Sequence, residues 1–480
     1  MVNSIFLSMK DLLKKARSPE FIVLFLMIIC YTVILSWVSC IRFWSFYALN
    51  DLAVFEQILW MTLRGHFFYS SLLTMSQFGL HNSPVLFILL PFYALFQNTE
   101  VLLVIQSFIY GAGAIPVYLI AKDKLGGRMG LFFSGLYLLY PPLHGANLAD
   151  FHEIAFAPLI LGMCLYFLMQ GKFRNYIIFS ILALTIKEDI SLIIITMTIW
   201  GLWYHKNTIK KDRIILFATI IISALWLIVS LFVIIPAFNT SSHYLFLNQY
   251  SNPIKSIVNY GPQKLTYLIE LLFPLGFTSI FSPGILIAGI TGFLAIFISP
   301  SEFYSDIYHH YSAYLIPFIF FSSVVSLNYI FSKITSDKIK FKNIIISVIL
   351  CCSISSFILY GPLLHPPYPP VYVTDDDKTL DLIISLIPEN AIVSTQANLL
   401  SHLSKRYIVT NIFLKDADVI LLYEKSVPEY YQLLKSIKVN ETVNQEISTG
   451  FMRIYNENGI SLFVRKSDTL ISGLKSFSKS

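Results

Sequence analysis

Residues 175–205 read NYIIFSILALTIKEDISLIIITMTIWGLWYH, an apolar run interrupted by Lys187-Glu188-Asp189. The run is too long for one membrane-crossing helix, which needs roughly 17–25 apolar residues. Each charged residue inside hydrocarbon costs about 2.5–3.5 kcal/mol on insertion scales, so charge is expected where the chain pairs it or meets water. We therefore predict two short helices, 175–187 and 190–205, joined by a charged break.

The charged residues at this break have two interpretations. Half-helices that meet at depth often present an ion or phosphate site. In that interpretation Lys187 pairs with a phosphate, while Glu188 or Asp189 binds a metal ion or an acceptor. The alternative is an internal ion pair between Lys187 and Glu188 that merely tolerates the turn. A plain turn would be expected to use Gly, Pro or Asn, which favours the first interpretation.

The composition of the whole chain agrees with a membrane location. Of its 480 residues, 56% are hydrophobic and only 13% are charged, whereas soluble domains carry about 25% charge. This predicts an α-helical polytopic membrane protein. Besides the broken run, the candidate crossings are residues 20–41, 100–121, 128–143, 153–170, 214–235, 264–281, 284–300, 312–332 and 343–361.

Loop charge predicts the orientation of these helices. Basic residues collect in the cytoplasmic start 1–19 and in the short loops 122–128, 171–174, 206–213 and 333–342. Because Lys and Arg favour cytoplasmic loops, this bias selects about 11 crossings in a domain 20–361, provided that residues 84–97 do not cross. The basic residues thus report topology, and no nucleic-acid partner is expected. The first loop, 42–81, then lies outside the membrane.

The composition changes after residue 361. Residues 362–374 are a proline-rich, stiff connector. Residues 375–480 resemble a small soluble α/β domain on the extracytoplasmic side. Its expected strands are 391–395, 407–410, 419–423, 451–455 and 461–465, and its expected helices are 379–386, 397–404 and 428–437.

The long first loop carries candidate catalytic acids. The apolar repeat after Asn50 suits a helix lying on the membrane surface. Asp51, and more weakly Glu56, could act as a general base beside a lipid-borne substrate. Equally, Asn50 or Asp51 could simply cap that helix. At the end of the loop, His81 could bind a phosphate or an acceptor hydroxyl, or be an ordinary interfacial polar group.

Two further external segments carry candidate residues. In Asp150-Phe151-His152-Glu153, carboxylates and an imidazole could bind Mg²⁺ or Mn²⁺, although Asp150 could instead cap the next helix. The predicted metal ligands are Asp150, Glu188 and Asp189, and His152 is a candidate substrate contact. Near residue 310, His309 and His310 stand among acids and tyrosines and could contact a pyrophosphate or a sugar. Tyrosines alone would be an aromatic belt.

The order of these motifs resembles a known family. The motifs are Asp51-Leu52-x-x-Phe55-x-Gln57, His81-x-Ser83-Pro84, Asp150-Phe151-His152, Lys187-Glu188-Asp189 and His309-His310-Tyr311-Ser312-Ala313. Over roughly residues 45–465 the chain resembles a prokaryotic membrane-protein family of unknown function. That family is grouped with the GT-C superfamily of polyprenyl-phosphate-dependent glycosyltransferases.

The resemblance implies a GT-C-like fold and an inverting sugar transfer from a polyprenyl-phosphate donor, with membrane lipids as further partners. Asp51 would be the leading catalytic residue, Asp150 the second acidic position and Lys187 a donor-phosphate contact. Two alternatives stay open. One is a transporter or flippase of lipid-linked substrates, which would favour a site reachable from both faces. The other is a non-catalytic assembly protein, in which the charges would pair with one another and leave no cavity.

Overall fold

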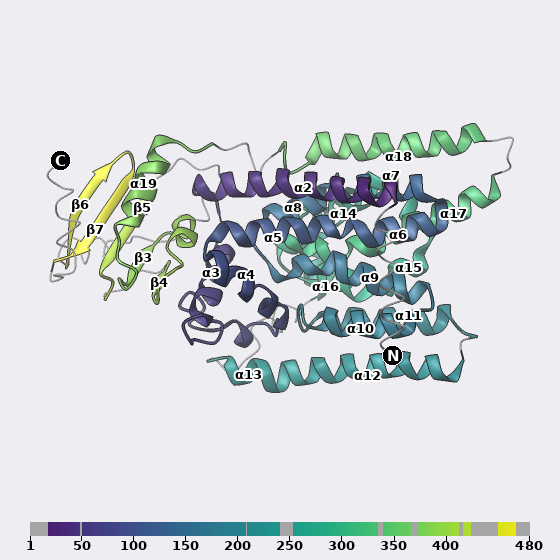
Figure 1. Cartoon of the computed structure of the whole chain (residues 1–480), viewed down its shortest axis with the longest axis horizontal. Helices are drawn as coiled ribbons and strands as arrows, with labels where there is room; N and C mark the ends of the chain where they lie inside the picture. Colours follow the sequence, from purple (N-terminus) through teal and green to yellow (C-terminus); the bar gives the residue numbers. More distant parts are fainter. Residues whose placement is uncertain are drawn as a thin grey trace.

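The computed structural model describes residues 18–48, 50–207, 209–240, 253–334, 339–365, 372–411, 416–423 and 450–466. A bundle of long helices carries a small sheet domain at one end (Figure 1). The predicted fold class, an α-helical polytopic protein with a C-terminal α/β domain, is confirmed. The bundle helices are α2 (Pro19–Trp44), α5 (Thr99–Ala112), α6 (Ala114–Leu125), α7 (Gly127–Leu138), α8 (Pro141–Leu148), α9 (Ala157–Met169), α10 (Phe173–Leu184), α11 (Ile190–Tyr204), α12 (Lys210–Val229), α13 (Ile235–Phe238), α14 (Pro253–Leu272), α15 (Pro283–Ala288), α16 (Ile290–Ile298), α17 (Ile316–Lys333) and α18 (Ile339–Tyr360).

Several of these helices are suited to lipid. Within the described ranges, five are long and apolar enough to cross a membrane: Pro19–Trp44, Thr99–Leu125, Lys210–Phe238, Ile316–Lys333 and Lys340–Tyr360. Shorter apolar helices cover Glu153–Met169, Phe173–Leu184 and Ile190–Tyr204. Exposed side chains such as Ile221 and Leu225 on α12 form the apolar surface that lipid would cover. The count of eleven crossings stays a prediction.

The charged break in the long apolar run lies where the sequence predicts it. Helix α10 ends at Leu184 and α11 begins at Ile190. Another predicted crossing, 284–300, is also split, into α15 and α16. At the junction, the ring of Phe318 lies 2.6 Å from where a Cβ on Gly289 would stand. A glycine there lets α17 pack closely against the junction.

The first loop, 42–81, folds into a compact unit against the bundle. It contains α3 (Asn50–Thr62) and a hairpin of β1 (Tyr69–Ser70) and β2 (Met75–Ser76), and α4 (Leu90–Phe96) follows it. The predicted helix after residue 50 forms, but its placement on the membrane surface is wrong. All of Leu52–Met61 is buried in protein. The apolar side chains of α3 pack against the hairpin, the bundle and the C-terminal domain and not against lipid.

In the described part of the C-terminal domain, an α-helix lies beside a mixed sheet. Helix α19 (Asp375–Ser385) precedes a sheet of order β4-β3-β5-β7-β6, in which β3 pairs in parallel with β4 and β5 while the remaining pairs are antiparallel. The strands are β3 (Val393–Thr395), β4 (Val409–Thr410), β5 (Val419–Tyr423), β6 (Phe451–Glu457) and β7 (Ile460–Arg465). All five lie within or over the predicted strand ranges. The expected helix at 397–404 is a short 3₁₀ turn, Ala397–His402, and 428–437 lies outside the described residues.

This domain is docked on the first loop. Its hydrophobic core includes Phe46 and Ala53 from the N-terminal part of the chain. Gln57 donates from Nε2 to the carbonyl oxygen of Arg406 at 3.0 Å, and the Ser71 hydroxyl donates to the carbonyl oxygen of Val409 at 2.8 Å. Helix α3 is therefore held between the bundle and the sheet domain (Figure 1).

Candidate functional site

The charged break between α10 and α11 is tied to the end of the first loop. Glu188 is almost fully buried, with 1% of its side chain exposed. Its carboxylate lies 2.9 Å from Nδ1 of His81 and accepts a hydrogen bond from the backbone amide of Asn82 at 3.0 Å. The break thus anchors a segment more than 100 residues away, and Glu188 is fully engaged by protein groups.

The other two residues of the break face a shared space. Asp189 accepts hydrogen bonds of 3.1 Å from the Tyr314 hydroxyl at both carboxylate oxygens. No hydrogen bond or ion pair joins the Lys187 ammonium to any residue that the structure describes, so the proposed internal pair with Glu188 does not form. Burial alone would lower the pKa of Lys187, but Asp189, then Glu153 and Glu188, raise it above its ordinary value. The ammonium is therefore charged.

Asp51 and His152 form a second pair at the pocket. The carboxylate of Asp51, 54% exposed, lies 3.1 Å from Nε2 of His152. Burial opposes ionisation, yet the hydrogen bond and charge of His152 leave the pKa of Asp51 below its ordinary value. The same partner, against the effect of burial, raises the pKa of His152. Asp51 is thus an ionised and accessible carboxylate.

His309 and His310 are adjacent in sequence but have different surroundings. The ring of His310 stacks on His152 with 3.6 Å between centroids. Burial, followed by the neighbouring His152 and Lys187, lowers the pKa of His310 well below its ordinary value, which keeps this ring neutral. His309 lies outside the pocket lining and pairs with Asp306, 3.4 Å from its carboxylate.

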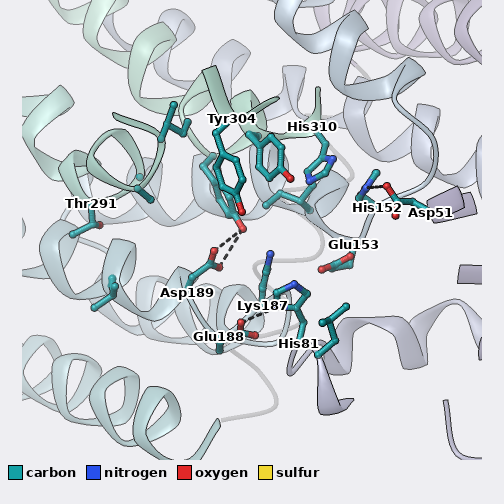
Figure 2. A pocket seen from close by; sticks show the side chains of 18 of the residues that line it. Asp51, His81, His152, Glu153, Lys187, Glu188, Asp189, Thr291, Tyr304 and His310 are labelled. Atoms are coloured by element: carbon teal, nitrogen blue, oxygen red, sulfur yellow. Dashed lines mark hydrogen bonds and ion pairs between the residues drawn. The ribbon is translucent and has the colours of Figure 1, made fainter. Parts of the chain in front are cut away.

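These groups line one pocket of about 490 Å³ (Figure 2). Its polar lining is Asp51, Gln77, His81, His152, Glu153, Lys187, Glu188, Asp189, Thr291, Tyr304, His310, Tyr311 and Tyr314. Its apolar lining comes mainly from α3, α11, the end of α12 and α16, and includes Val54, Phe55, Leu192, Leu227, Leu231, Leu294, Ala295 and Ile298. The pocket therefore has a charged part and an apolar part.

Two predicted catalytic acids lie outside this pocket. The carboxylate of Asp150 accepts from the amide of Leu52 at 3.3 Å, so Asp150 caps the first turn of α3 from a distant segment. Its own backbone has φ +65°, a left-handed conformation that turns it away from its neighbours in sequence. Glu56 is fully buried among hydroxyl groups on the far side of α3. Neither carboxylate lines the space that Asp51 faces.

The predicted metal set does not fit this arrangement. Asp150 lies apart from the pocket, and Glu188 and Asp189 already accept hydrogen bonds from protein donors. Over the ranges that the structure covers, no three His, Cys, Asp or Glu side chains lie close enough together to hold an ion. A divalent ion would need several such oxygen ligands at about 2.0–2.6 Å. Asp150, Glu188 and Asp189 therefore do not form a metal site in the described part of the chain.

Sequence reasoning passed over several residues that the fold brings to the pocket. Glu153 lies in a charged turn whose pattern indicates a metal ligand and not a substrate contact. For Tyr304 and Tyr311 an aromatic belt is the ordinary explanation, and the sequence gives no separate signal for Tyr314. Glu302 and Asp306 gave the signal that this segment is more than a belt, since they place charge among the tyrosines.

A bundle of apolar helices with a charged pocket beside a broken helix defines a polytopic membrane protein with an internal polar site. The family described as "Predicted membrane protein (DUF2079)" matches residues 42–462, and the chain belongs to that family. Among solved structures, the chain is similar to ArnT from Cupriavidus metallidurans bound to undecaprenyl phosphate, with a TM-score of 0.48 and 11% identity over 92% of this chain and 98% of that one. A similarity at that level supports no conclusion about activity. The comparison with curated proteins found no match.

Proposed function

We propose that this protein is a membrane glycosyltransferase of the GT-C kind. It transfers a sugar from a polyprenyl-phosphate donor to an acceptor hydroxyl on the extracytoplasmic face. The observation that supports this most is that one pocket combines an accessible carboxylate, Asp51, the ammonium of Lys187, which makes no hydrogen bond or ion pair with the described residues, and an apolar lining.

The apolar side of the pocket suits a lipid. Leu192 on α11 and Leu294 on α16 are 44% and 49% exposed, respectively. They line the pocket together with Leu231, which lies in a π-helical turn after α12. A prenyl chain can lie along such side chains while its phosphate reaches the ammonium of Lys187, because a half-buried cation that lacks a direct ion pair with the described residues attracts an anion. An isolated water-soluble substrate would gain nothing from this apolar half.

The proposed chemistry needs only groups of this chain. The carboxylate of Asp51 takes the proton of the acceptor hydroxyl, and that oxygen attacks the anomeric carbon of the donor. The bond between the anomeric carbon and the phosphate oxygen breaks, and its electron pair leaves with the lipid phosphate. Lys187 stabilises the negative charge that develops on this leaving group. His152 holds Asp51 in place, and attack from the side opposite the phosphate inverts the configuration.

The direct test replaces Asp51 with Asn in the full-length protein reconstituted in lipid vesicles. We expect Asp51→Asn to lower the rate of transfer by about 10²–10⁴-fold, since a general base contributes about that much, with unchanged thermal stability. A matched Asp306→Asn variant, which changes a carboxylate outside the pocket lining, should retain transfer. Full activity of Asp51→Asn would remove this residue from the catalytic role.

The transporter alternative makes a different prediction. A flippase would move polyprenyl phosphate across the vesicle membrane without changing the lipid chemically. The lipid recovered after transport would then be the same for the wild-type protein and for Asp51→Asn. Translocation of unmodified lipid by the wild-type protein, with no sugar transfer to any acceptor, would favour that alternative.

A further inference from the structure

Four rings form a continuous aromatic wall along one side of the pocket. We define this wall as Tyr304, Tyr311, His310 and His152. Tyr304 stacks on Tyr311 with centroids 3.9 Å apart and ring planes within 15°. The ring centroids of Tyr311 and His310 are 4.1 Å apart, and those of His310 and His152 are 3.6 Å apart. All four rings line the pocket, and the last of them is the residue that contacts Asp51.

The wall is more than core packing. Tyrosines that only fill the bundle, such as Tyr137 and Tyr140, are 1% and 0% exposed, and their hydroxyls donate to backbone carbonyls. Tyr304, Tyr311 and His310 are instead half-buried, and the space they adjoin is the pocket. The aromatic wall therefore presents ring surface to whatever the pocket holds.

A carboxylate without a direct hydrogen-bond donor among the described residues lies across the pocket from Tyr304 and His310. Glu153 is 4% exposed and lines the pocket. No hydrogen bond or ion pair to its carboxylate is found among the residues that the structure describes. Figure 2 shows Glu153 and Lys187 on the side opposite Tyr304 and His310. A buried carboxylate is costly unless donors satisfy it, so a ligand carrying several donors would relieve this group.

We propose that the aromatic wall and Glu153 together form the subsite for a pyranose ring. This inference rests on the proposed function and assigns the place of the sugar within that same pocket. A pyranose has an apolar face of C–H groups and an edge of hydroxyls. The face packs on the rings of the wall, and two hydroxyls donate to the carboxylate of Glu153.

The position of this subsite agrees with the proposed chemistry. One end of the aromatic wall is His152, which contacts Asp51, and Lys187 lies across from the wall. A ring held there lies between the acceptor base and the group that receives the phosphate. The residues of the subsite hold and select the sugar, while Asp51 and Lys187 act on the bonds that change.

The test compares lipids with and without a sugar. The full-length protein in lipid nanodiscs is titrated with polyprenyl phosphate and with polyprenyl-phosphate-linked glucose, mannose and galactose. We expect at least one glycosylated lipid to bind more tightly than the bare lipid. Glu153→Gln should weaken that binding at least tenfold, since hydrogen bonds to a charged group are lost. Tyr304→Leu should weaken it roughly threefold to tenfold, and Tyr304→Phe, which keeps the ring, should not.

Binding of the bare lipid serves as the internal control. Glu153→Gln and Tyr304→Leu should leave it unchanged, whereas Lys187→Met should weaken both kinds of lipid. The subsite is overturned if no glycosylated lipid binds more tightly than the bare one, or if the sugar-dependent gain survives in Glu153→Gln. Failure of Lys187→Met to affect either lipid would count against the proposed function itself, which separates the two outcomes.

A stability measurement guards against a merely structural effect. No hydrogen bond or ion pair to the Glu153 carboxylate is found in the described part of the chain, and only its longer-range attraction to Lys187 and His152 is lost in Glu153→Gln, so the thermal midpoint should change little. A lowered midpoint together with weaker binding of both lipids would assign Glu153 a role in folding and contradict the sugar subsite.

Discussion

Replacing Glu56 with Ala should loosen the C-terminal domain from the bundle. The Glu56 carboxylate accepts from the hydroxyls of Tyr93 at 3.3 Å, Thr99 at 2.6 Å and Ser404 at 2.5 Å. These donors belong to α4, to the first turn of α5 and to the C-terminal domain. One carboxylate of the first loop thus joins three segments that are far apart in sequence.

The magnitude follows from the count of hydrogen bonds and from burial. A hydrogen bond to a charged group contributes about 1.5–3 kcal/mol, and part of that offsets the burial of the carboxylate itself. Breaking a buried charged network by removing its centre typically costs about 3–5 kcal/mol. Glu56→Gln keeps one carbonyl acceptor, and its amide can donate to a rotated hydroxyl, so about 0.5–1.5 kcal/mol is expected.

Limited proteolysis of the purified protein can measure this undocking. When opening is fast relative to cleavage, the cleavage rate between the bundle and the C-terminal domain follows the population of the open form. A change of about 3 kcal/mol then corresponds to an increase of about 10²-fold for Glu56→Ala. Glu457→Ala, which removes an exposed carboxylate at the far edge of the sheet, is the matched control and should cleave like the wild type.

The result that would refute this reasoning is equally specific. If Glu56→Ala and Glu457→Ala are cleaved at the same rate, the carboxylate does not hold the domain. If Glu56→Ala and Glu56→Gln are both stably docked but both lack sugar transfer, the carboxylate acts in catalysis and not in docking.

Three other outcomes are expected. Burial raises the pKa of Glu56 above its ordinary value, so the folded protein binds a proton more tightly than the unfolded chain does. Stability should therefore fall as the pH rises from about 4.3 through the raised pKa of the folded state. In Glu56→Gln the thermal midpoint should no longer decrease across that pH range for this reason. Gly145→Ala should lower the thermal midpoint by several degrees, because its Cβ would overlap the carbonyl oxygen of Ile307 and push the segment of the aromatic wall. His402→Ala should destabilise docking by about 1–2 kcal/mol in chemical denaturation, because the His402 ring is stacked between two phenylalanine rings, each with its centroid 4.0 Å away. An unchanged thermal midpoint in Gly145→Ala, or an unchanged denaturation midpoint in His402→Ala, would contradict these packing arguments.

The candidate site was only partly readable from the sequence. Asp51 and Lys187 were recognised because charge beside apolar runs is unusual, and both line the pocket. Glu56 carries the same signal but lies elsewhere. Residues five apart on a helix are rotated by roughly 140°, so Glu56 faces the C-terminal domain when Asp51 faces the pocket. Residues far away in sequence therefore decide which side of α3 lines the pocket.

A similar limit applies within a single turn. Asp150 and Glu153 belong to one charged segment, and the local sequence favours Asp150 over Glu153 as the catalytic acid. The left-handed backbone at Asp150 directs its carboxylate to the amide of Leu52, and Glu153 enters the pocket instead. Side-chain direction in an irregular turn follows from tertiary contacts, which composition and spacing do not contain.

The amino-acid sequence by itself determined the membrane class, the break at Lys187-Glu188-Asp189 and the strands of the C-terminal domain. These features come from the length and periodicity of apolar runs, which act over a few neighbouring residues. The tertiary structure alone decided that the C-terminal domain covers α3, and that Glu153 and the aromatic wall share a pocket with Asp51. The physical reason is that such contacts join segments a hundred or more residues apart, and their free energy exists only once the chain has packed.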